Sequence, residues 1–172
     1  MFIDDEGCLQ LSMWTRAVTV ANLTIFFSLK LGLLAFWNLW YVIAVTTNLC
    51  EGFAELRIFP KTWRFASGNL RAITEATNKY SPSCRLPRLL FFGVLCWQLA
   101  VVFLFAAAIV ASMLAGSLHS EAVHAAFLVA LGLWSAFMLA DEILKQYDVE
   151  HSHVLFFLAQ LLTLVALHML PS

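Results

Sequence analysis

Residues 89–114, LLFFGVLCWQLAVVFLFAAAIVASML, decide the fold of this chain. They contain no Asp, Glu, Lys, Arg or His. As an α-helix rising 1.5 Å per residue, the stretch is about 39 Å long. Because the apolar core of a bilayer is about 30 Å thick and takes roughly 20 helical residues, this stretch predicts a membrane-spanning helix.

The composition of the whole chain agrees with a membrane location. Of its 172 residues, 62% are apolar and 12% are charged, whereas roughly 25% of the residues in a soluble domain are charged. A net charge of -1 gives no basic excess for nucleic acid, and the four Cys form no CxxC pair. A soluble enzyme, a zinc module and a disulfide-rich miniprotein therefore do not fit, and the sequence predicts an integral membrane protein.

Two further stretches are long and apolar enough to cross a bilayer. Residues 122–140 are polar only at His124 and Ser135. Residues 154–170 form a shorter stretch with three polar side chains inside it, and they span the bilayer if both ends lie at the headgroups. Each stretch therefore predicts one crossing.

The first crossing has two alternative positions. Residues 17–50 form an apolar stretch that is too long for one crossing, and Lys30 lies in its middle. A Lys at the bilayer centre costs about 2.5–3.5 kcal/mol. We prefer a crossing over 31–49, with the Lys30 side chain extended to the interface. The alternative is a crossing over 17–36, with 37–50 at the opposite interface.

Four crossings predict an all-α fold, a four-transmembrane-helix bundle that forms one integral membrane domain over residues 1–172. A basic loop, residues 51–87, joins the first two crossings. Seven of the ten Lys and Arg lie in this loop or next to it: Arg57, Lys61, Arg64, Arg71, Lys79, Arg85 and Arg88. The positive-inside bias places the loop in the cytoplasm and both termini outside. The expected location is a bacterial inner membrane or an organellar inner membrane.

The basic loop is expected to contain a short amphipathic helix. Ser67 is a candidate N-cap for a helix that runs to about Lys79. Arg71, Glu75 and Lys79 follow each other at i, i+4 spacing with attracting signs. Aromatic residues flank this segment, which favours a helix lying in the headgroup layer. A solvated surface helix is the alternative.

Two histidines are candidate cofactor ligands. In an alternating bundle His124 and His168 lie near the same outer surface, on different helices. A bis-His haem b site needs two imidazoles that face each other across a bundle. Histidines also lie at membrane interfaces because one end of the ring is wet, and we prefer that interpretation. No metal site is expected.

A second group of polar residues is expected nearer the opposite surface of the membrane. Gln98 and Gln160 occupy similar depths on two helices that run in the same direction, and Trp97 and Trp134 lie nearby. Buried amides in lipid need partners, so we prefer a Gln–Gln pair that fastens the two helices together. The alternative is a pocket that these four residues line for a quinone or a lipid.

Small residues predict where two of the helices pack. Alanines recur every fourth residue on both sides of the turn near residue 117, which lets helix backbones approach closely. We expect the two stripes to face each other, as helix-packing positions: Ala107, Ala111 and Ala115 on one helix, and Ala122, Ala126 and Ala130 on the other.

No residue pattern indicates catalysis. Asp141 and Glu142 end the third crossing, and a hydrophilic end is the simplest interpretation of the pair. His151 and His153 lie in a connection and are expected at the surface. No nucleophile–base pair, Gly-rich phosphate loop or metalloprotease motif is present, so we do not expect an enzyme.

Two stretches resemble a family of predicted small integral membrane proteins. One is Trp63 with RAIT at 71–74, and the other is LWSAFM at 133–138, followed by Asp141 and Glu142. The family consists of four-span chains of about this length that carry a domain of unknown function. The resemblance implies the N-terminus inside and the long loop outside, which conflicts with the charge distribution. It implies no mechanism.

The resemblance also raises a disulfide. If the long loop is outside, Cys50 and Cys84 lie in an oxidising compartment, at the ends of the two helices that flank the loop. The two thiols would then be a candidate pair.

The function expected from these features is that of a non-catalytic accessory subunit of a larger membrane protein complex, such as a respiratory or photosynthetic electron-transfer complex. Fifteen Phe, six Trp and an aromatic-rich basic loop suit docking to other subunits, and bound membrane lipids are expected. The first alternative is a membrane anchor that binds haem b or quinone. The second is a small transporter or a lipid-binding protein, in which Lys30 or Asp141 would matter.

Overall fold

The chain folds as an all-helical bundle in a computed structural model that describes residues 5–60, 64–80 and 85–171, with side chains of the first helix described from Leu23 onward. Five helices follow one another: α1 (Asp5–Glu55), α2 (Asn69–Asn78), α3 (Arg85–Ala115), α4 (Ser120–Leu144) and α5 (Tyr147–Met169). Four of them are long and apolar enough to cross a membrane. The expected multi-pass helical membrane fold is thus confirmed.

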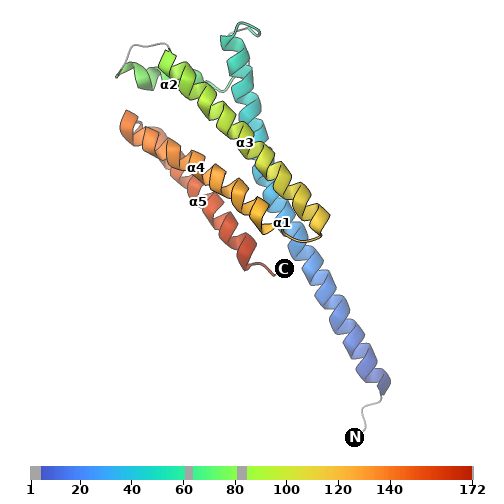
Figure 1. The fold of residues 1–172 in the computed structure, drawn as a ribbon. Coiled ribbons are helices and arrows are strands. Elements are labelled where there is room, and N and C mark those ends of the chain that lie inside the picture. The colour runs from blue at the N-terminus through green and yellow to red at the C-terminus, as the bar shows by residue number, and fades with distance from the viewer. Residues whose placement is uncertain (1–4, 61–63, 81–84, 172) are drawn as a thin grey trace.

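The long helices alternate in direction (Figure 1). The short α3–α4 and α4–α5 connections require this, and the longer segment that contains α2 returns the chain so that α3 runs antiparallel to α1. In this arrangement α3 runs along α1, α4 along α3, and α5 along α4. We call the end that carries the C-terminus of α1, the helix α2, the N-terminus of α3 and the α4–α5 connection the basic end. The other end carries the α3–α4 turn and the C-terminus of the chain, and we call it the turn end.

The helix α1 is one continuous rod, and its register against α3 places Lys30. Asn48 is hydrogen-bonded to Gln98, and the ring of Tyr41 stacks on that of Phe105. Continuing this antiparallel register along α1 brings Lys30 level with the α3–α4 turn, where the bundle ends. The register therefore favours residues 31–49 over 17–36 as the crossing. Lys30 is nevertheless buried, with 4% of its surface exposed, so it does not lie free at the surface.

The N-terminal half of α1 extends beyond the bundle (Figure 1). Residues 5–29 lie past the level of the α3–α4 turn and make up about 37 Å of helix at 1.5 Å per residue. Three large apolar side chains at the start of the described part, Leu23, Ile25 and Leu29, are 40%, 61% and 48% exposed. From Leu23 onward, where its side chains are described, this segment thus has an apolar surface that the rest of the described chain leaves open.

The core of the bundle is aromatic and continuous across all four long helices. Tyr41 of α1 stacks on Phe105 of α3, Phe105 packs edge-to-face on Phe127 of α4, and Trp134 of α4 stacks on Phe156 of α5. Outside this core, many large apolar side chains point away from the bundle. Such a surface is costly in water and neutral in lipid, which is the physical reason for a membrane location.

Only one of the two expected alanine stripes faces inward. On α4, Ala126 and Ala130 are fully buried and Ala122 is half-buried. On α3 the prediction is wrong by one position, because Ala107 and Ala115 are exposed and Ala111 is half-buried. The inward face of α3 is instead marked by buried side chains that recur every three or four residues: Phe91, Leu95, Gln98, Val101, Phe105, Ala108 and Ser112. A buried polar residue, Gln98, is in phase with this face.

The amphipathic helix expected in the basic loop is α2. Leu70, Ala76 and Thr77 are its buried residues, while Arg71 and Glu75 form an exposed i, i+4 ion pair at 3.8 Å. Its N-cap is Gly68 in a left-handed conformation with φ of 80° and not Ser67. Glycine adopts this conformation without the steric cost that a Cβ would bring.

Candidate functional site

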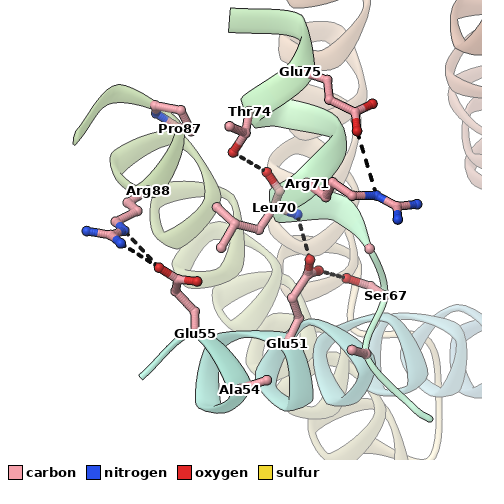
Figure 2. Close-up of a pocket in the computed structure, with 12 residues that line it drawn as sticks. Glu51, Ala54, Glu55, Ser67, Leu70, Arg71, Thr74, Glu75, Pro87 and Arg88 are labelled. Atoms are coloured by element: carbon pink, nitrogen blue, oxygen red, sulfur yellow. Dashed lines mark hydrogen bonds and ion pairs between the residues drawn. The ribbon is translucent and has the colours of Figure 1, made fainter. Parts of the chain in front are cut away.

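A pocket of about 830 Å³ lies at the basic end, between the last turns of α1, the helix α2 and the first turn of α3 (Figure 2). Five charged side chains line it, three acidic and two basic: Glu51, Glu55, Glu75, Arg71 and Arg88. The hydroxyls of Ser67 and Thr74 complete its polar lining. A hollow with both signs of charge, at the end of membrane-spanning helices, is the candidate site of this protein.

The Glu51 carboxylate holds α2 against α1. Its Oε1 accepts a hydrogen bond from the backbone N–H of Leu70 at 3.0 Å, and its Oε2 accepts one from the hydroxyl of Ser67. The first N–H groups of a helix have no partner within the helix, and a carboxylate there also interacts favourably with the helix dipole. Glu51 therefore caps α2 from another helix, and this fixes one wall of the pocket.

An ion pair between α1 and α3 forms the opposite wall. The Arg88 guanidinium donates from Nη2 and Nε to Glu55 Oε1, at 2.6 and 3.0 Å. Pro87 precedes it in the first turn of α3, where a missing backbone N–H costs nothing because that N–H has no helical acceptor. Thr74 lines the pocket from α2, and its hydroxyl donates to the carbonyl of Leu70 at 2.7 Å.

A ladder of amides continues from the pocket into the bundle. Asn69, the first residue of α2, donates from Nδ2 to Asn48 Oδ1 at 2.8 Å, and Asn48 donates from Nδ2 to Gln98 Oε1 at 2.7 Å. Asn48 and Gln98 are buried, with 2% and 5% of their surfaces exposed. Amides inside an apolar bundle need partners, so this ladder fixes the register of α1 and α3 below the pocket.

The structure brings His124 and His168 together at the turn end. Their Nε2 atoms are 2.7 Å apart, and the rings stack with 4.7 Å between centroids. His168 Nδ1 faces the carbonyl of Leu164 at 2.8 Å, so this nitrogen carries a proton and the neutral ring accepts at Nε2. His124 then donates. In a bis-His haem the iron lies between the two nitrogens, so the rings would have to separate to hold one.

The expected pair of glutamines does not form, because each side chain is hydrogen-bonded to a residue of α1 instead. Gln98 accepts from Asn48, whereas Gln160 donates from Nε2 to the hydroxyl of Tyr41 at 2.9 Å. Both glutamines fasten their helix to α1, so their role as helix fasteners holds and the partner predicted for each is wrong. The Oε1 of Gln160 is buried without a hydrogen-bond partner.

The two tryptophans predicted at this depth differ in their exposure and in their hydrogen bonds. Trp97 is 39% exposed and donates from Nε1 to the carbonyl of Val129 on α4 at 3.0 Å. Trp134 is 4% exposed, and its Nε1 has no hydrogen-bond partner. Neither of the two described pockets is lined by Trp97, Trp134 or the two glutamines.

Asp141 is not simply the hydrophilic end of a crossing. It is 6% exposed, and its Oδ2 lies 2.5 Å from His153 Nδ1 on α5. The His153 ring also stacks on Phe137. The adjacent Glu142 is exposed, as expected for both carboxylates. The pairing was missed because each residue alone has a simpler explanation, as a helix end or as a surface histidine.

The structure describes only one of the two thiols that the family resemblance suggested as a pair. Cys50 is a free, half-buried cysteine at the basic end, and Cys84 lies outside the described residues. Within the part of the chain that the structure describes, no group of three or more His, Cys, Asp or Glu is arranged to hold a metal ion.

Comparison with known proteins adds no relative. No family model, no curated protein and no solved structure matches this chain. The resemblance to small four-span membrane proteins thus stays an interpretation of short motifs, and the geometry of the bundle carries the functional argument.

Proposed function

We propose that this chain is a non-catalytic accessory subunit that packs against a larger membrane protein. The observation that carries the proposal is the N-terminal half of α1, which leaves the bundle as a single helix with exposed Leu23, Ile25 and Leu29 (Figure 1). Isolated helices gain most of their stability from packing an apolar face. A rod with open apolar side chains beyond the expected crossing therefore calls for a protein surface beside it.

The rest of the bundle is consistent with a partner of this kind. The core joins α1 to the other helices through Tyr41, Trp37 and Trp40, so a partner bound to the protruding half of α1 would be attached to the whole bundle. Trp37 also donates from Nε1 to Thr163 Oγ1 of α5 at 3.1 Å. The partner complex that we expect is a respiratory or photosynthetic complex in a bacterial or organellar inner membrane. Identification of the partner protein tests this part of the proposal as well.

The test compares two exposed isoleucines on different helices. Ile25 is 61% exposed on the protruding half of α1, and Ile143 is 70% exposed near the end of α4. A photo-crosslinking amino acid at position 25, in native membranes, should give one discrete adduct with a larger membrane protein. Ile25→Glu should release the chain from that complex in mild detergent, whereas Ile143→Glu should leave it bound. Crosslinking of position 25 to lipid alone would overturn the proposal.

A further inference from the structure

Two neighbouring hollows at the basic end share one residue, Arg88. The polar pocket between α1, α2 and α3 has the charged lining described above. Beside it lies a second hollow of about 610 Å³ that Leu86, Leu89 and Phe92 of α3 line together with Arg85, and Arg88 lines both hollows. A charged hollow next to an apolar one is complementary to an amphiphile, with its headgroup in the first and its chain against the second.

The depth of the two hollows matches the surface of a bilayer. Arg88 directly precedes the apolar stretch that begins at Leu89, and Leu89 itself is 73% exposed on the outside of the bundle. A guanidinium at this boundary is at the level of lipid phosphates, whereas the apolar side chains below it face the acyl region. The polar pocket therefore opens where headgroups are.

The charges of the polar pocket indicate which headgroup fits. The polar pocket has three carboxylates and two guanidiniums, and Arg85 of the second hollow brings the formal charge of the two hollows together to about zero. Such a balanced lining favours a headgroup that carries both signs of charge over a purely anionic one. The Arg71–Glu75 pair is loose, at 3.8 Å with side chains 83% and 73% exposed, so either group can turn to a ligand. A zwitterion satisfies both signs at once, with its phosphate at arginine and its cation at glutamate.

A primary ammonium suits this pocket better than a quaternary one. Carboxylates such as Glu75 accept hydrogen bonds, and a primary ammonium has three N–H donors whereas a choline group has none. We propose that the two hollows form a binding site for a phospholipid of the phosphatidylethanolamine class. Its ammonium contacts Glu75 and its phosphate contacts Arg71, two residues that lie together on one side of α2 (Figure 2). The rest of the lipid passes Arg88, and an acyl chain lies along Leu89 and Phe92.

Native mass spectrometry of the purified, delipidated protein tests the site. The protein is mixed with equal amounts of phosphatidylethanolamine, phosphatidylcholine and phosphatidylglycerol that carry the same acyl chains. We expect one tightly retained phosphatidylethanolamine, preferred about tenfold over the other two, because charge-assisted hydrogen bonds to the ammonium are lost with choline and absent with glycerol. Equal retention of all three lipids, or preference for phosphatidylglycerol, would overturn the proposal.

Two variants separate the phosphate contact from the ammonium contact. Glu75→Gln should abolish the preference over phosphatidylcholine while phosphatidylcholine still binds, and Arg71→Gln should weaken both zwitterionic lipids alike. Both residues are exposed by more than two thirds, so neither change should affect folding. Glu142→Gln and Arg64→Gln remove exposed charges that do not line the pocket and should leave the preference intact. Wild-type selectivity in both Glu75→Gln and Arg71→Gln would contradict the assigned contacts.

Discussion

The contact between α1 and α3 and the contact between α4 and α5 are held by different chemistry. Between α1 and α3, Asn48 pairs with Gln98 and Glu55 pairs with Arg88. Between α4 and α5, each polar contact includes a histidine, His153 with Asp141 and His124 with His168. The first contact combines amides that do not titrate with an ion pair, and the second is built from imidazoles and aromatic rings.

The connections between the helices explain this difference. The helices α1 and α3 are separated by a long segment that includes α2, and such a segment does not fix how the two helices slide against each other. Buried amides supply that register, since a slip would leave them without partners. The helices α4 and α5 are joined through Lys145, which has a φ of 54°, and Gln146. A tight turn sets the register of α4 against α5, so the polar contacts between these two helices are not needed to fix it.

The largest expected effect is at Asn48, because its amide joins two partners. Asn48→Leu would leave Gln98 Oε1 buried without a donor and would release Asn69 of α2. We expect a loss of about 2 kcal/mol in the free energy of unfolding, measured by reversible unfolding in mixed micelles.

Asn38 is the matched control on the same helix. Its Oδ1 is buried without a hydrogen-bond partner, so Asn38→Leu should be neutral or stabilising. Equal losses in the two variants would show that the amide ladder does not hold α1 to α3 as described.

A smaller effect is expected at Asp141, on the α4–α5 side of the comparison. Asp141→Ala removes the partner of His153 Nδ1 from a site that is 6% exposed. We expect a loss of about 1.5 kcal/mol in the free energy of unfolding. The neighbouring Glu142 is exposed, so Glu142→Ala should change stability little. If the two variants behave alike, the Asp141–His153 pair contributes nothing to the α4–α5 contact.

The smallest effect is expected at the histidine pair of the turn end. Both rings are exposed, and water can replace their mutual hydrogen bond once one ring is removed. His124→Ala should therefore cost about 0.5 kcal/mol in unfolding free energy, and His151→Ala, at an exposed position near the basic end, should cost less. A loss as large as that of Asn48→Leu would reverse the ranking of the two contacts.

The sequence predicts the helices well and their contacts in part. Lengths of apolar sequence give four spans, and alternation of direction puts His124 and His168 at the same depth, where the structure finds them in contact. Which helix lies opposite a given face depends on packing in three dimensions. Gln98 and Gln160 therefore both meet α1 and do not meet each other.

The candidate site at the basic end illustrates a second limit of prediction from the sequence. Glu51 lies two residues after the expected crossing and has the simple explanation of a solvated loop residue, yet it caps α2 from a different helix. On α3, the alanine stripe pointed one residue away from the inward face, whereas the polar Gln98 was in phase with it. Within an apolar span, a lone amide is thus a better guide to the packed face than a run of small residues.

The most direct test of the account is the position of α1 in the membrane, because the protruding half of that helix carries the proposed function. Single cysteines would be placed along α1 in a cysteine-free background, and the purified chain would be labelled in lipid nanodiscs with a membrane-impermeant thiol reagent. We expect protection over positions 31–49, with labelling at Ile25 and Ile58. Protection centred on 17–36, with position 25 unreactive and positions 37–50 labelled, would contradict the account.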